Sequence, residues 1–164
     1  MISDYINYFE KLAKSNVALL AQGDNFFAVI DLDASLKEIS YDVPYGCYFF
    51  RLIIPSMTIN YNNVDQHNES MEGMFMIGRM HNPQDDDDKI NALLDVEKLA
   101  KQFVNKITQD SRNGLSFIGR SMDNPSFRFD TELVAGDTCY AAIRVLFSMT
   151  QIYDICRVEP GDWA

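Results

Sequence analysis

The chain has 164 residues, of which 47% are hydrophobic and 23% charged, and its formal net charge is −10. This length and composition are those of an ordinary globular domain, which excludes global disorder and predicts a single domain over residues 1–164. The excess of 24 acidic over 14 basic residues repels a phosphate backbone, so direct binding to DNA or RNA is disfavoured.

The cysteines and the N-terminal segment indicate the compartment. Cys47, Cys139 and Cys156 are widely spaced, form no CxxC pair and lie among apolar residues, which is typical of buried thiols in a reducing compartment. The first residues mix acidic and apolar side chains, unlike a signal peptide, and the sequence has no apolar run of about 18 residues that would span a membrane. We therefore expect a soluble, cytoplasmic protein that does not contact membranes.

The N-terminal part of the chain predicts one helix followed by two strands. Apolar residues recur at steps of three and four between about residues 3 and 21, which is typical of a helix with one buried face. The stretch 25–34 has the composition of a strand. The next strand is predicted between Pro44 and Pro55, and because it is apolar on both faces except at Arg51, we expect it in the centre of a sheet.

A polar stretch at about residues 57–71 is rich in Asn, Asp, Glu, His and Ser. It is too long for a tight turn, which leaves an extended loop or a flexible hairpin arm as alternatives, and long loops of compact domains are commonly functional. Ile59, Tyr61 and Val64 are the apolar and aromatic residues within it, so we predict that they contact a protein partner.

Four consecutive carboxylates, Asp85, Asp86, Asp87 and Asp88, precede a helical pattern that ends at about residue 109. Carboxylates in the first turn of a helix meet the positive end of its dipole, and one of them can cap free N–H groups, so the run predicts the start of a helix at residue 85. Neighbouring helical residues point about 100° apart, which disfavours convergence on one metal ion. A docking patch for a basic partner stays as the alternative.

A long antiparallel hairpin is predicted near the C-terminus. Between residues 127 and 133 the side chains alternate strictly, with the aromatic Phe127 and Phe129 on one side and the charged Arg128 and Asp130 on the other. After a glycine-containing turn, the apolar stretch 139–150 is expected to pair back.

The final segment, about residues 158–164, is predicted to form an arm beyond the last strand. Its Trp163 either folds back onto the domain or anchors a neighbouring protein. The complete pattern predicts an α+β fold, in which a mostly antiparallel sheet packs with two main helices, at about residues 3–21 and 85–109, and closes with the long hairpin.

Sequence motifs for catalysis are missing from the chain. It contains no GxSxG, HExxH, P-loop or GxGxxG pattern, and His67 and His81 have no serine or cysteine beside them in a nucleophile setting. We therefore expect no catalytic residue, no metal site and no cofactor. An enzyme whose site has no motif, beside Arg51 and Arg79, is kept as the third of three functional hypotheses.

The order of the expected elements resembles that of the tail-terminator and head–tail connector proteins of long-tailed bacteriophages. The resemblance is carried by "FMIGRMHNPQDDDDKINALLDVEKLAKQFV" and "FRFDTELVAGDTCYAAIRVLFSM" and covers most of the chain. It implies a ring-forming assembly protein without catalysis, whose loops bind neighbouring subunits and whose location is the virion. It is an architectural resemblance, so it transfers no functional residue.

These observations favour two functions over that of an enzyme. The first is a non-enzymatic structural protein that associates with itself and with neighbouring assembly proteins, through the polar stretch and the C-terminal arm. The second is a small acidic adaptor or inhibitor that binds a basic protein through Asp85–Asp88.

Overall fold

The structure is a computed structural model that describes residues 2–21, 26–30, 43–63, 66–113, 126–134 and 139–153, with the backbone alone at 57, 59–63, 66–69 and 149–153. Its elements are, in chain order, α1 (Ile2–Ser15), α2 (Val17–Leu20), β1 (Phe27–Ile30), β2 (Tyr48–Asn63), β3 (Gln66–Met80), α3 (Asp86–Arg112), β4 (Phe127–Val134) and β5 (Tyr140–Tyr153).

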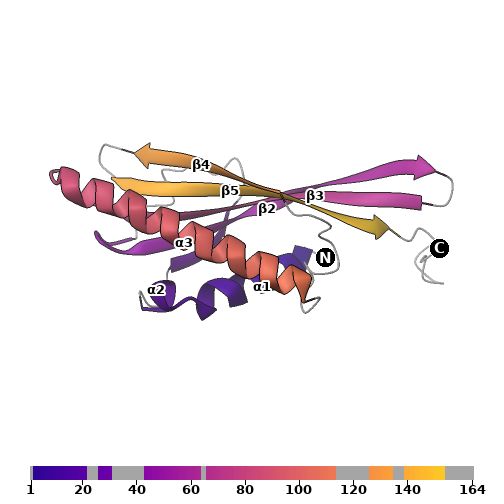
Figure 1. Cartoon of the computed structure of the whole chain (residues 1–164), viewed down its shortest axis with the longest axis horizontal. Coiled ribbons are helices and arrows are strands. Elements are labelled where there is room, and N and C mark those ends of the chain that lie inside the picture. The colour runs from indigo at the N-terminus through magenta and orange to yellow at the C-terminus, as the bar shows by residue number, and fades with distance from the viewer. Residues whose placement is uncertain are drawn as a thin grey trace.

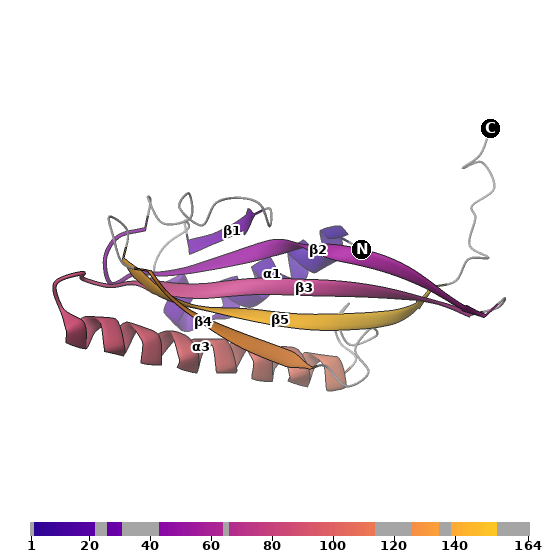
Figure 2. The same cartoon turned by 90° about the horizontal axis from the view of Figure 1, so that it is seen from above.

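The five strands form one sheet in the order β1-β2-β3-β5-β4 (Figure 2). β1 pairs with β2 in parallel, and every other pair is antiparallel. The three helices lie on one side of this sheet (Figure 1). The predicted α+β fold with a mostly antiparallel sheet and a closing hairpin is therefore confirmed, and the strand β3 rather than β2 is the central one.

The first helical segment is interrupted at Asn16, which the apolar periodicity did not predict. The backbone of Asn16 is extended, and its Oδ1 accepts hydrogen bonds from the N–H groups of Ala18 (3.0 Å) and Leu19 (3.3 Å). An asparagine in this position caps a new helix, so the chain ends α1 at Ser15 and begins α2 at Val17.

An aromatic cluster fills the space between the helices and the sheet. Phe50 and Phe75 stack on neighbouring strands with ring centroids 5.3 Å apart, and Phe103 of α3 lies 5.1 Å from Phe50. Phe9 of α1 lies 5.6 Å both from Phe75 and from Phe147 of β5. All five rings are buried, so α1 and α3 are fixed on the same part of the sheet by one core.

The face of the sheet away from the helices has a smaller buried cluster. Phe49 is fully buried there together with Met76, and its ring lies edge-on to Tyr140 at 5.5 Å. The Phe49 ring also covers Gly78, where an added Cβ would stand 2.1 Å from a ring carbon. Glycine is required at position 78 because a neighbouring side chain occupies the space.

Pro55 does not end the strand in which it lies, contrary to the prediction. β2 continues to Asn63, and its register against β3 shifts between Ile53 and Ser56. Proline has no N–H for the ladder, and a bulge is a position where the missing donor is tolerated. The strand therefore continues past Pro55, at a point where its pairing with β3 is irregular.

The prediction of a loop at about residues 57–71 was wrong, and the alternative of a hairpin arm is what the structure contains. β2 and β3 remain paired as far as Asn63 and Gln66, and β5 accompanies β3 as far as the pair His67 and Tyr153. Because β3 is paired on both sides, its backbone hydrogen bonds support a strand despite the weak strand propensity of its polar residues.

We define the arm as the part of the sheet formed by residues 56–63 of β2, 66–72 of β3 and 148–153 of β5. Figure 1 shows it projecting beyond the three helices. With a rise of about 3.3 Å per residue, the seven residues of β3 in the arm span about 20 Å.

Candidate protein-interaction site

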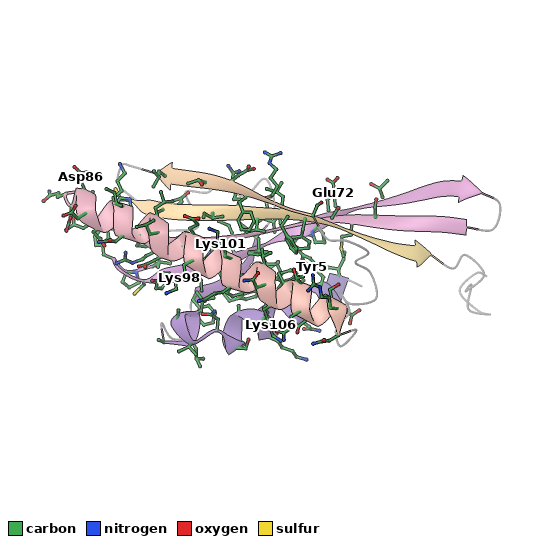
Figure 3. The ribbon with its side chains drawn as sticks, viewed as in Figure 1. Tyr5, Glu72, Asp86, Lys98, Lys101 and Lys106 are labelled. Atoms are coloured by element: carbon green, nitrogen blue, oxygen red, sulfur yellow. The ribbon has the colours of Figure 1, made fainter. Side chains whose placement is uncertain are left out.

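Those predicted interaction residues that the structure describes fall in two separate places. Ile59 and Tyr61 lie on β2 within the arm, where the structure describes the backbone alone. Val64 and Trp163, with the predicted arm at 158–164, lie outside the described residues. The four aspartates lie at the start of α3, at the opposite end of the molecule from the arm (Figure 3).

The start of α3 is built largely from its own aspartates. The side chain of Asp85 is the N-cap and accepts hydrogen bonds from the N–H groups of Asp87 (3.0 Å) and Asp88 (3.1 Å). Asp88 accepts a hydrogen bond from the N–H of Asn82 (2.8 Å) and another from Arg79 (3.0 Å). Two of the four carboxylates therefore hold the helix start, and α3 extends to Arg112, three residues beyond the expected end at residue 109.

Electrostatics support this role for Asp88. The hydrogen bond from the backbone of Asn82, followed by the charge and hydrogen bond of Arg79, lowers the pKa of the Asp88 carboxyl below its usual value. Asp85, Asp86 and Asp87 are exposed, and because Asp85 is the N-cap, Asp86 and Asp87 are the exposed members of the run whose carboxylates are not part of the cap. Among the described residues, no group of three or more His, Cys, Asp and Glu side chains could hold a metal ion.

The two arginines of the enzyme hypothesis have structural partners. Arg51 is buried, and its guanidinium donates to the backbone oxygens of Phe26 (2.9 Å) and Phe50 (3.2 Å). Arg79 pairs with Asp88 at 3.0 Å and lies 3.5 Å from Asp95 on α3. These contacts tie β1 to β2 and β3 to α3, and they do not bring the two guanidinium groups to a common site.

A cavity of about 210 Å³ lies between α1 and α3. The Ser15 hydroxyl in its wall donates to the Leu12 carbonyl, the Asn16 side chain caps α2, and Lys106 pairs with Asp110. Its lining residues are Leu12, Ser15, Asn16, Gln102, Phe103 and Lys106. The side chains of Ser15, Asn16 and Lys106 in the cavity wall thus make their described contacts with residues of the helices themselves.

The arm begins where the helical layer ends. The Tyr5 hydroxyl of α1 donates to the backbone oxygens of Ile53 (3.3 Å) and Met74 (3.5 Å), and burial raises the pKa of this tyrosine. The neighbouring Gly73 is covered by the Phe147 ring, which an added Cβ would approach to 2.6 Å. Just beyond this point Glu72 is exposed and points away from the helices (Figure 3).

The strand β4 is the second candidate surface, and the sequence predicted a half-exposed strand here without indicating which face is exposed. Its apolar residues Phe129 and Leu133 are 40% and 48% exposed, although they lie on the face that carries the helices. The charged Asp130 and Glu132, on the other face, are less exposed than these two. The alternation identified the strand correctly, but it did not predict which side is covered.

The charged side of β4 is held by the neighbouring strand. Glu132 accepts a hydrogen bond from the Tyr140 hydroxyl at 3.2 Å and lies 3.3 Å from the guanidinium of Arg144. Burial, and then the charge of Glu132, raises the pKa of Tyr140. Arg128 forms a two-pronged hydrogen bond with Asp130, with both distances at 2.9 Å. Tyr140 and Arg144 of β5 thus partly bury Glu132 on the polar side of β4.

Comparison with protein-family models gave no match, and comparison with curated protein sequences gave none either. In the described ranges, no helix combines the length and apolarity needed to cross a lipid bilayer.

Proposed function

We propose that the chain is a non-enzymatic structural protein that associates with copies of itself and with neighbouring proteins in a larger assembly. The arm is the observation that carries this proposal. Three paired strands continue past the hydrogen bonds of α1 to the sheet, at Ile53 and Met74, into a region beyond the helices (Figure 1). Extended strand ribbons of this kind bind neighbours by adding backbone pairing or by inserting into a groove.

A ring component of the tail or neck of a long-tailed bacteriophage is the specific form of this proposal. Its support is the order of the elements, with an N-terminal helix, a mostly antiparallel sheet, a second helix with an acidic start and a closing hairpin. In such a ring the arm would contact the next subunit, and the protein would be located in the virion.

The acidic adaptor or inhibitor has less support. Its proposed surface was the complete run of aspartates, and Asp85 and Asp88 are already bound to backbone N–H groups of their own chain. Asp86 and Asp87 are left as the exposed carboxylates of the run that do not hold the helix start.

The solution mass of the full chain, measured by light scattering over rising concentration, tests self-association. We expect a mass above that of the monomer. In a matched variant, residues 59–69 are replaced by Asn-Gly, which joins Thr58 to Ser70, two residues that stand opposite each other in the hairpin. The aromatic core lies outside this deletion, so the variant should fold and have a lower mass than the parent.

Substitution of both Asp86 and Asp87 by asparagine provides the control, because it changes exposed charge at the far end of the molecule and should leave the mass unchanged. A full chain that is monomeric at every concentration would contradict self-association. A shortened variant with the parent's mass would show that the arm is not the contact.

A further inference from the structure

The strand β4 forms one edge of the sheet within the described residues. It has eight residues, whereas β1 at the opposite edge has four. An edge strand presents a row of N–H and C=O groups that can pair with another strand, and proteins usually shorten or cover such edges. A regular strand of eight residues is long enough to act as a template for pairing.

The apolar side of this edge is open as well. Phe129 is 40% and Leu133 48% exposed, whereas Val145 and Ala141, which pair with them on β5, are buried. The helix α3 packs on β5 and β3, so its cover stops one strand short of β4. The backbone of β4 and its side chains Phe129 and Leu133 are therefore available to a partner that continues the sheet, whereas Phe127 packs against Phe147 of the core.

The charges of β4 indicate which partner fits. Arg128 and Asp130 flank Phe129 on the other face of the strand, and their side chains are 74% and 32% exposed. In an antiparallel pair of two identical strands centred on Phe129, each Arg128 lies opposite Asp130 of the second copy. Opposite charges directly across a strand pair are favourable, and the aromatic rings meet on the other face.

The neighbouring symmetric register fits less well. Centring the pair on Asp130 would bring the two Asp130 carboxylates together, which is unfavourable for like charges directly opposite each other. It would also place Arg128 opposite Glu132, which is hydrogen-bonded to Tyr140 and ion-paired with Arg144, whereas centring on Phe129 only exchanges the exposed Arg128–Asp130 pair within a strand for the same pair between strands. The strand is thus self-complementary in one register.

We propose that β4 pairs edge to edge with β4 of a second copy of this chain, antiparallel and with Phe129 opposite Phe129, so that one sheet continues across a twofold dimer. This inference rests on the proposed self-association and adds the surface and the register. A single strand pair with a few apolar side chains is a small interface, so the dimer dissociates in the micromolar range.

Sedimentation velocity of the full chain over rising concentration tests the proposal through charge exchange. Arg128→Asp places acids opposite acids in the proposed register, and Asp130→Arg places arginines opposite arginines. We expect either variant alone to lose the dimer. An equimolar mixture of the two should regain it, because every facing pair is then opposite in charge, and the double variant R128D/D130R should dimerise like the parent.

Matched controls separate this effect from charge in general. Lys98→Asp and Asp86→Arg make the same changes at exposed positions of α3 and should leave the dimer intact. Circular dichroism and a thermal melt establish that each variant is folded. The exchanged residues form an exposed ion pair of their own, and such pairs contribute little to the stability of a monomer.

The outcomes separate the two proposals. If both single variants keep the parent's mass, edge pairing is overturned while self-association through another surface stands. If the single variants lose the dimer and their mixture does not regain it, the register is overturned. A parent chain that stays monomeric overturns the edge pairing and the proposed self-association together.

Discussion

The strands β4 and β5 run side by side and alternate in the same way, but beyond Phe127, which packs against Phe147, they differ strongly in burial. On the helix side, Ile143, Val145 and Phe147 of β5 are 3%, 0% and 4% exposed. In the same ladder, Phe129 and Leu133 of β4 lie opposite the buried Val145 and Ala141, yet they are 40% and 48% exposed. The two strands share one backbone environment and differ in the helix above them, because α3 packs on β5 and β3.

This difference shows that the layer of helices, and not the sheet, decides which apolar residues belong to the core. The same boundary explains the arm, since α1 makes its last polar contact with the sheet through Tyr5 and the strands continue beyond it. The surfaces proposed for assembly are thus the two parts of the sheet that the helices leave uncovered.

The largest expected effect is a difference in stability between two phenylalanine variants, one under the helices and one on the strand that they leave uncovered. Phe75 lies at the centre of the aromatic cluster and is fully buried, so Phe75→Ala should lower the free energy of unfolding by about 3–5 kcal/mol. Phe129→Ala, on the uncovered strand, should change it by no more than about 0.5 kcal/mol. Urea unfolding at low protein concentration, where any dimer is dissociated, measures both. Equal losses would show that Phe129 belongs to the core.

A smaller effect is expected on the opposite face of the sheet, at Gly78. An added Cβ would stand 2.1 Å from the Phe49 ring, so Gly78→Ala should cost about 1–3 kcal/mol of the free energy of unfolding through overpacking. Combining it with Phe49→Ala, which empties that space, should cost less than the sum of the two single variants in the same urea assay. Strict additivity would mean that the Phe49 ring is not the obstacle.

Much of the fold could be predicted from the sequence because its long elements have strong periodic signals. The α3 helix, the C-terminal hairpin and the antiparallel sheet follow from such periods, and a run of acids defined the start of α3. The break at Asn16 and the continuation of β2 past Pro55 could not be predicted. Residues of these types can either end an element or be accommodated within it, and the surrounding structure decides which occurs. The arm was misjudged because pairing on both sides of β3 outweighs a polar composition.

The candidate sites were harder to predict than the fold. The alternation in β4 gives the two faces of the strand, but which face is covered depends on the position of α3, which packs on β5 and β3. The run of aspartates could be interpreted correctly as a helix start because capping acts within a few residues. Interactions over long sequence distances leave no comparable local pattern, and the burial of Arg51 against the Phe26 carbonyl is one of them.

The hydrogen bond that joins α1 to α3 predicts a moderate effect with a pH dependence. The Tyr8 hydroxyl donates to Asp110 at 3.0 Å, and burial followed by the charge of Asp110 raises the pKa of Tyr8. The folded protein therefore keeps this proton while unfolded tyrosines ionise near their ordinary pKa of 10.0, so stability is complete below that pH and falls above it. Tyr8→Phe should cost about 1.5 kcal/mol near neutral pH and weaken this alkaline decline.

Urea unfolding at neutral and alkaline pH measures the effect of Tyr8→Phe. Tyr45→Phe is the matched control, since Tyr45 is 60% exposed and should change neither value. An unchanged alkaline decline in the Tyr8 variant would mean that another group sustains it.

The smallest effect is expected within the aspartate run, where Asp88 is hydrogen-bonded and Asp86 is exposed. The backbone of Asn82 and the charge of Arg79 lower the pKa of Asp88, so its contribution is present at neutral pH and is lost as the pH falls through that lowered pKa. Asp88→Asn should cost about 1 kcal/mol at neutral pH and reduce the acid sensitivity of unfolding. Asp86→Asn, at an exposed position of the same helical turn, should cost a few tenths of a kcal/mol through the helix dipole alone. Thermal melts between neutral and acid pH distinguish the two, and equal behaviour would indicate that the dipole, and not the bonds to Asn82 and Arg79, gives the run its role.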